Sequence, residues 1–427
     1  VPYLTPSAPY LELQPFYFWL FALIIKVFHF SDIANAVRLI NALIIFGVIA
    51  LMGQIGSGLS AFRNGRSVIM ILISCVGFIN NAYQLSPNIV VLFGFSLYFY
   101  ALQKSAHMPG ISAWLLSIGL IFISLNFTAQ FIVIALLILF ILPLLSKEWR
   151  TPEYLICAGG GLALFTLLFG SYVWQLNSVD HAFYLEWEGK YLSFISFNLA
   201  DYGQSALFLV ETLAWYLIPA WVLVIWTLYK RRSRIFQDKI LTLSLLSSGL
   251  LLLFAVLSGQ HDESVIFPII IPFVLLASVE IDSIKITIVS LLNWFCIFTF
   301  GLAGAFIATL YIALNFGRPH ELFIKAKYYA PNYAFQFNVW QLALAVLITF
   351  IWLFMITRKH IRGREMVTNW ASGSTFVLVM FISLCLPWFN AVLSFQDVVG
   401  SSLPHLKNTG SNCIATNQAN RVQNALW

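Results

Sequence analysis

Charged side chains are scarce in this sequence. Asp, Glu, Lys and Arg together make up only 9% of the 427 residues, whereas apolar residues make up 60%. So few polar side chains could not cover the water-exposed surface of a domain of this size, and the mean hydropathy is +0.86. The composition excludes a soluble globular protein and indicates a chain surrounded by lipid.

Cysteine is scarce as well. Four of the five cysteines lie inside apolar segments, where they are interpreted as packing residues: Cys75, Cys157, Cys296 and Cys385. No Cys-x-x-Cys pair occurs, so the sequence predicts neither a disulfide framework nor a metal site. The net charge of +6 does not indicate a nucleic-acid partner, because the basic residues are confined to short clusters between apolar segments.

Long apolar runs are abundant. They are continuous rather than alternating, which favours membrane-spanning helices over barrel strands. Twelve runs are predicted to span the bilayer: 33–56, 67–85, 88–103, 111–125, 129–146, 154–174, 206–229, 240–258, 265–280, 286–314, 339–357 and 371–394. The predicted fold class is an all-α polytopic integral membrane protein.

The segments between these runs alternate in charge. One set of alternate segments holds fifteen Lys and Arg residues, and the other set, counted from 80–87 through the C-terminal tail, holds six. The positive-inside rule therefore predicts that the first set lies in the cytoplasm. The outward set, where acidic and aromatic residues collect, consists of the N-terminal segment, 80–87, 175–205, 259–264, 315–338 and the tail from Phe395.

The first residues do not form a full span. The apolar segment 16–30 is short and contains Lys26 and His29, so it is expected to be either a helix at the membrane interface or a short buried helix. An outward N-terminus beginning at Val1 leads us to expect a chain truncated at both ends, with about thirteen spans when intact. The expected domains are a first outer loop with an interfacial helix (1–32), a transmembrane bundle (33–394) and the start of an outer C-terminal domain (395–427).

Four stretches resemble one family of membrane enzymes. Residues 9–19 read PYLELQPFYFW. This stretch resembles the PYLEKPPLYYW motif in the first periplasmic loop of bacterial GT-C glycosyltransferases of the aminoarabinose transferase and protein O-mannosyltransferase type, in glycosyltransferase families 39 and 83. Residues 81–102 and 262–277 resemble the family's HxLxxDxxLL helix and RxxYxLPLLPPLALLA segment. Residues 370–394, followed by 413–416, resemble its last span and the start of its C-terminal domain, so the resemblance follows the order of the whole chain.

The resemblance implies a reaction and its partners. Such enzymes transfer a sugar from a polyprenyl-phosphate donor to a lipid A-like lipid or a protein, on the periplasmic face of the bacterial inner membrane. The GT-C fold implied is a bundle of about twelve transmembrane helices with periplasmic loops and interfacial helices. No cofactor beyond the polyprenyl-phosphate sugar donor and no oligomer are expected, and the partners are membrane lipids, the lipid-linked donor and the acceptor.

The sequence departs from the family at several positions. The family's first catalytic Asp would precede Val1, and the Lys that holds the donor phosphate in relatives is Leu13. The Asp of the second motif is Asn88, and the Tyr of the third is Val265. Because an apolar side chain cannot replace a charge-assisted phosphate contact, a catalytically impaired member stays open. A non-enzymatic transporter or flippase of lipid-linked sugars also stays open, although the internal repeats that it predicts are not evident.

Inverting sugar transfer needs a carboxylate beside the acceptor and cations beside the leaving phosphate. The predicted catalytic carboxylates are Glu12, Asp262 and Glu263. The predicted substrate-binding residues are Tyr10, Arg38, Glu186, Glu188, Lys190, Glu211 and His261.

Each of these predicted site residues is selected for a specific feature of the sequence. Tyr10 and Glu12 match the first motif, and His261 offers a cation in place of the one missing at Leu13. Acids alternate with aromatics in 175–205, as carbohydrate sites require. The Glu211 carboxylate lies inside an apolar span, where burial is costly, and Arg38 can extend toward a phosphate. Solvated loops, an ordinary charged turn at 261–263 and lipid-headgroup anchors are the alternative interpretations.

Overall fold

The computed structural model describes most of the chain. The described residues are 3–5, 8–9, 15–28, 33–58, 62–82, 84–125, 128–193, 199–331, 333–334, 337–358 and 362–393. Tyr10, Glu12 and the tail 395–427 lie outside these residues, so the predictions made for them are not examined by the structure.

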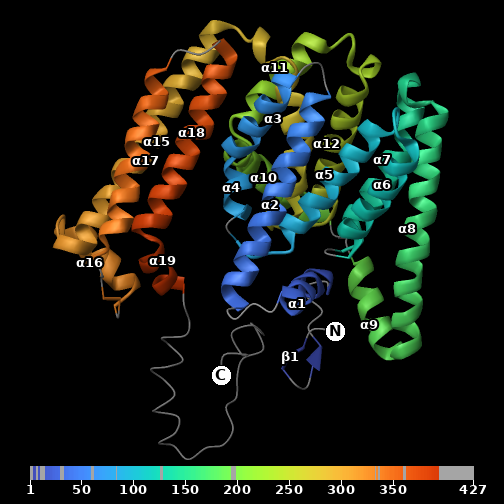
Figure 1. The fold of residues 1–427 in the computed structure, drawn as a ribbon, viewed down its shortest axis with the longest axis horizontal. Helices are drawn as coiled ribbons and strands as arrows, with labels where there is room; N and C mark the ends of the chain where they lie inside the picture. Colours follow the sequence, from blue (N-terminus) through green and yellow to red (C-terminus); the bar gives the residue numbers. More distant parts are fainter. Residues whose placement is uncertain are drawn as a thin grey trace, which may run out of the picture. The chain divides into compact units, whose positions relative to one another are not determined.

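The described residues are almost entirely helical and fall into two compact units (Figure 1). The larger unit lies within 11–292 and 360–371, and the smaller within 1–10, 293–359 and 372–427. The α-helices up to the last of the larger unit are α1 (Phe16–Phe28), α2 (Ile33–Ser57), α3 (Phe62–Ser74), α4 (Val76–Ala82), α5 (Asn88–Lys104), α6 (Pro109–Ser124), α7 (Gln130–Leu145), α8 (Pro152–Val179), α9 (His181–Leu192), α10 (Leu199–Tyr216), α11 (Ala220–Arg231), α12 (Lys239–Leu257), α13 (Glu263–Ile266) and α14 (Ile270–Val279). Short 3-10 turns are η1 (Lys147–Trp149), η2 (Ile235–Gln237), η3 (Phe267–Ile269) and η4 (Ile281–Ser283).

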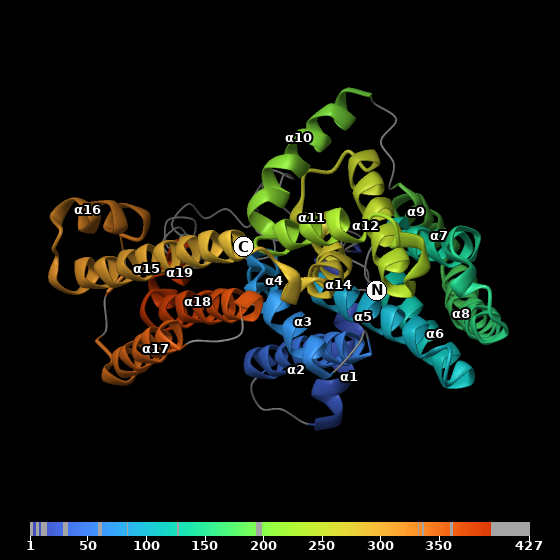
Figure 2. The ribbon, with the colours of Figure 1, turned by 90° about the horizontal axis from the view of Figure 1, so that it is seen from above.

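The smaller unit is built on three long helices, α15 (Ile286–Phe316), α17 (Val339–Thr357) and α18 (Arg362–Leu384), with α16 (His320–Tyr329) and α19 (Leu386–Leu393). Both α15 and α18 contribute residues to the two units. Within the smaller unit the Trp352 and Phe376 rings stack at 4.5 Å. This contact joins α17 to α18, which lie side by side in Figure 2. A two-stranded antiparallel sheet of β1 (Tyr3–Thr5) and β2 (Ala8–Pro9) precedes α1.

Helices α5 and α14 form the centre of the larger unit. Most of their residues are buried, as expected for helices that are apolar on every side. Helix α5 packs on α2 and α6, and α14 packs on α3, α11 and α12. Gly94 and Gly119 allow α5 and α6 to cross closely, because a Cβ on either glycine would meet the other's carbonyl oxygen at 3.0 or 2.9 Å.

Each of the twelve predicted spans coincides with a helix or a broken pair of helices. Among the described residues, six helices are long and apolar enough to cross a membrane: Asn35–Ser57, Pro152–Val179, Lys239–Leu257, Ile286–Phe316, Val339–Thr357 and Arg364–Leu384. Two more spans result if each bent pair counts as one, namely α3 with α4, bent by 71°, and α10 with α11, bent by 98°. The remaining predicted spans are shorter helices. A multi-pass membrane protein is therefore confirmed, whereas the count of twelve stays a prediction.

The basic segments of the larger unit meet at one end of the bundle. Glu280, just past the end of α14, forms ion pairs with Lys230, at 2.9 Å, and with Arg231 at the end of α11. Arg364 at the start of α18 holds Asp282 through two hydrogen bonds of 2.8 and 2.6 Å. Three basic segments that are distant in sequence thus lie together, as the charge alternation predicts.

Two further contacts extend this end. Gln103 at the end of α5 donates to the Ile55 carbonyl near the end of α2, over 2.8 Å. The Trp149 indole donates to the Lys239 carbonyl over 3.3 Å, which joins the segment after α7 to the start of α12. We call this region the basic end of the larger unit.

The opposite helix ends meet one another. Asn41 in α2 donates to the Ala82 carbonyl at the end of α4, over 3.1 Å. The Tyr191 hydroxyl of α9 donates to the Ser124 carbonyl at the end of α6, over 3.1 Å. We call this region the acidic end, because it carries Asp262, Glu263 and the acidic residues of α9.

The described residues of the outward segment 175–205 are mostly helical. Helix α8 continues to Val179, and the Asp180 carboxylate accepts from the Phe183 amide at 3.0 Å, which starts α9 at once. Trp187 and Tyr191, four residues apart, are the buried face of α9. The alternation of acids and aromatics is thus the pattern of an amphipathic helix.

Candidate active site

Two helix breaks form the centre of the candidate site at the acidic end. Helix α3 ends at Ser74 and α4 leaves at 71°, with Cys75 at the break. Helix α10 ends at Tyr216, before Pro219, whose nitrogen cannot donate a helical hydrogen bond. The Tyr216 ring lies against Gly77, where a Cβ would be only 2.3 Å from the ring. The absence of a side chain at Gly77 therefore allows the two breaks to approach.

Asn81 connects the elements around these breaks. Its amide nitrogen donates to the Gly77 carbonyl at 3.0 Å and to the Tyr216 hydroxyl at 2.9 Å. Its amide oxygen accepts from the Asn88 side chain, at the start of α5, at 3.2 Å. Asn81 is only 2% exposed, so this network fixes α4, α5 and α10 in a place that water hardly reaches.

The acidic group begins where this network meets α13. The Asn80 amide donates to Glu263 Oε2 at 2.7 Å, which orients a half-buried carboxylate. Asp262 is exposed and accepts from the Ser264 hydroxyl at 2.5 Å. We call Asn80, Asn81, Tyr216, Asp262 and Glu263 the Asn–Glu cluster. It offers two carboxylates, one held by an amide and one open to solvent. A carboxylate in such a place can accept a proton from the hydroxyl group of a substrate.

His261 and Glu211 lie beside the cluster. The exposed His261 ring makes an edge-on contact of 5.9 Å with Phe208 of α10. Glu211 is exposed one turn further along α10, on the side of the helix that carries Phe208. The structure thus brings His261, Asp262 and Glu263 to the same helix ends as Glu211.

Arg38 lies on α2, one turn before Asn41, which contacts the end of α4. Its guanidinium is exposed and donates to the Asn35 side chain at 3.3 Å. The side chain is therefore on the acidic end of the larger unit and is open to a ligand from outside the protein.

Glu186, Glu188 and Lys190 lie elsewhere. All three are on α9, which packs on α8 through the Trp187 and Tyr191 rings, and Figures 1 and 2 show α9 beside α8, apart from α4. Partial desolvation, and then the nearby Glu188 carboxylate, raise the pKa of the Tyr184 hydroxyl. These residues form an amphipathic surface at the acidic end that is separate from the Asn–Glu cluster.

Sequence reasoning missed the residues that organise the site. Asn80, Asn81 and Tyr216 are not among the predicted site residues, although an Asn pair within an apolar run was a readable signal. Tyr216, three residues before Pro219, carried the weaker signal of a helix break. No group of three His, Cys, Asp or Glu side chains among the described residues could hold a metal ion.

The bundle and its site define an all-α polytopic membrane protein with a polar cluster at broken helix ends. No family model and no curated protein matches the sequence. Two solved structures do match in fold. ArnT from Cupriavidus metallidurans bound to undecaprenyl phosphate superposes with a TM-score of 0.65 at 10% identity, over 98% of this chain and 75% of that one. The apo form of the same ArnT gives 0.64 at 12% identity, over 100% and 75%. The chain thus has a GT-C glycosyltransferase-like fold, as the resemblance implies.

Proposed function

We propose that this protein is a membrane glycosyltransferase that uses a polyprenyl-phosphate sugar as donor and a lipid A-like lipid or a protein as acceptor. The observation that supports this most is the Asn80–Glu263 hydrogen bond of 2.7 Å. It joins the residue immediately before the stretch 81–102 to the stretch 262–277. The two stretches separately resemble family motifs, and the fold of the chain is similar to that of an ArnT bound to undecaprenyl phosphate.

The proposed roles follow from the geometry. Glu263, oriented by Asn80, accepts the proton of the acceptor or stabilises the charge that develops in transfer. Asp262, which is exposed beside it, binds sugar or acceptor hydroxyls. His261 and Arg38 are the proposed cations for the donor phosphate, in place of the Lys that is Leu13 here. Tyr10 and Glu12 complete the donor site in this proposal.

The site is proposed to face the periplasm of a bacterium, in the inner membrane. The positive-inside rule places the basic end in the cytoplasm, and the Asn–Glu cluster lies at the other end of the bundle. An amphipathic donor is then met by polar groups at the membrane surface and by apolar helices below them. We propose that the protein acts as a monomer without a cofactor.

One observation favours an impaired enzyme as the second candidate. Asn88, in place of the family's Asp, is bound to Asn81 within an amide network, and Val265, in place of Tyr, is buried with 1% exposure. Neither position presents an ionisable group to a substrate. A member that binds the lipid-linked sugar without transferring it would have this arrangement.

The two candidates differ in turnover. The intact protein is reconstituted in liposomes with radiolabelled undecaprenyl-phosphate aminoarabinose and lipid A, and the release of undecaprenyl phosphate is measured. An active enzyme releases it, and Glu263→Gln lowers the rate at least about a hundredfold, in the range of general acid–base catalysis. Glu153→Gln, in the first turn of α8 at the basic end, is the control and keeps the wild-type rate. Binding of undecaprenyl phosphate without turnover in the wild type supports the impaired member, and neither binding nor turnover contradicts both.

A further inference from the structure

A cavity of about 300 Å³ opens at the basic end of the larger unit, away from the Asn–Glu cluster. It is lined by the end of α5, the start of α12, η1 and parts of α2 and α14. The 17 residues of α5 run from Asn88, which donates to Asn81 of the cluster, to Lys104 beside the cavity. At 1.5 Å per residue this is roughly 25 Å, so the cavity is a separate feature.

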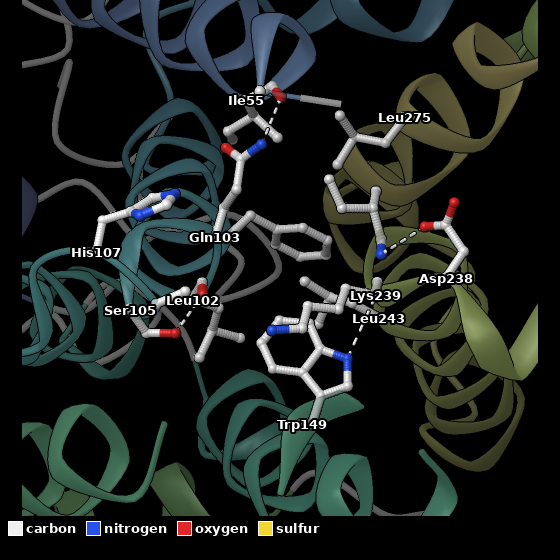
Figure 3. Close-up of a pocket in the computed structure, with 14 residues that line it drawn as sticks. Ile55, Leu102, Gln103, Ser105, His107, Trp149, Asp238, Lys239, Leu243 and Leu275 are labelled. Carbon is white, nitrogen blue, oxygen red and sulfur yellow. Dashed lines mark hydrogen bonds between the residues drawn. The ribbon is translucent and has the colours of Figure 1, made fainter. Parts of the chain in front are cut away.

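The cavity has an apolar floor and a polar mouth. Phe99, Leu102, Leu243 and Leu275 form the floor. The mouth carries Gln103, Ser105 and His107 on one wall and Trp149, Asp238 and Lys239 on the other (Figure 3).

Several of the polar groups are already engaged. The Gln103 amide donates to the Ile55 carbonyl, and the Ser105 hydroxyl donates to the Leu102 carbonyl at 2.7 Å. The Asp238 carboxylate accepts from the Ile240 and Leu241 amides at 3.0 and 3.3 Å, which caps α12. The only carboxylate of the lining is therefore held at the helix start, where it faces the two amides through one of its oxygens.

Two donors remain for a ligand. The Lys239 ammonium lies over the Trp149 ring at 5.7 Å, and it belongs to none of the salt bridges of the described residues. The His107 imidazole is exposed at the facing wall, as Figure 3 shows. Lys104, which follows Gln103 in α5, adds positive charge near the mouth.

We propose that this cavity binds the phosphate group of an anionic phospholipid. The phosphate accepts from Lys239 and His107, and the first carbons of the lipid lie on the apolar floor. Basic pockets between membrane helices at the cytoplasmic surface, where anionic lipids are enriched, are suited to such headgroups. A soluble phosphate compound could accept hydrogen bonds from the same donors, but it would gain no binding free energy from apolar contact with the floor.

The test is native mass spectrometry of the purified intact protein in a neutral detergent, titrated with phosphatidylglycerol or phosphatidylcholine. Phosphatidylglycerol is expected to bind, and Lys239→Gln weakens its binding about tenfold, the effect of one lost charge-assisted hydrogen bond. Lys147→Gln removes an exposed charge at the same end without touching the cavity and is the matched control. His107→Ala is the second variant, at an exposed position where folding is not at risk, and it also weakens binding.

Three outcomes overturn the proposal. The first is an equal loss in the Lys239 and Lys147 variants, which would mean only a general attraction of charge. The second is displacement of the lipid by millimolar inorganic phosphate or glycerol phosphate, which would make the ligand a soluble phosphate. The third is equal binding of phosphatidylcholine, which has no net charge.

Discussion

Asn80 and Glu263, separated by 183 residues in the sequence, are joined by a hydrogen bond of 2.7 Å. The bond connects α4, which leaves α3 at a sharp break, to the start of α13. It fixes the orientation of the carboxylate to which we give the central role in sugar transfer, and Asn80 is therefore a positioning residue.

Removal of this amide is expected to slow transfer while leaving donor binding intact. Asn80→Ala should lower kcat on the order of tenfold, with little change in KM, because Glu263 keeps its charge but loses its orientation. Asn315→Ala is the control, since Asn315 bonds within its own helix, to the Tyr311 carbonyl. Equal kcat values in the two variants would remove Asn80 from the mechanism.

Replacement of Glu12 or of the exposed Asp262 should abolish transfer. Glu12→Ala and Asp262→Ala, each in the full-length protein, are expected to give no detectable product in membranes, because both carboxylates are assigned to substrate. Expression in membranes is measured by immunoblot as the control for folding. Unchanged turnover in both variants would exclude the site assignment.

Gly77 should tolerate no side chain. In Gly77→Ala the new methyl group would lie 2.3 Å from the Tyr216 ring, which is held by Asn81. Overpacking of this kind costs about 1–3 kcal/mol, so the Tm in detergent should fall. Gly159→Ala is the matched control, because no atom lies within 4 Å of its added methyl group. A Tm for Gly77→Ala equal to that of the control would contradict the close approach of α4 and α10.

Some of this arrangement was readable in the sequence, and some was not. The positions of the helices and the grouping of the basic segments follow from apolar length and charge, which are local properties. The approach of the two breaks to each other involves residues 135 positions apart, as the Asn81–Tyr216 bond shows, and no local pattern predicts that pairing. The helix around Glu186 was not predicted, because alternating acids and aromatics also occur in solvated loops. In the structure Trp187 and Tyr191 pack on α8, a contact that the local sequence does not reveal.

We expect the protein to lose stability at low pH as the Glu280 carboxylate at the basic end becomes protonated. Burial raises the pKa of this carboxyl, but hydrogen bonds from Ser283, Lys230 and Arg231 outweigh burial and lower the pKa to about 2, from an ordinary value of 4.5. The folded state thus binds the proton less readily than the unfolded state. The stabilisation is fully present above pH 4.5 and is lost as the pH falls toward 2.

The variant Glu280→Gln tests this contribution. It should lower stability at neutral pH by about 1–3 kcal/mol, because two cations lose their partner, and it should flatten the fall in stability between pH 4.5 and 2. Glu148→Gln, at an exposed position of η1, is the control. An unchanged pH profile in Glu280→Gln would mean that other carboxyls control acid unfolding.

The proposed transfer at the periplasmic face requires the Asn–Glu cluster and the basic segments to lie on opposite sides of one membrane. Single cysteines at positions 232, 184 and 261, each in a chain whose native cysteines are replaced, are labelled in intact cells with a maleimide that does not cross membranes. We predict labelling at 184 and 261 in intact cells, and at 232 only after the membrane is permeabilised. Labelling of 232 and 261 from the same side would contradict the account.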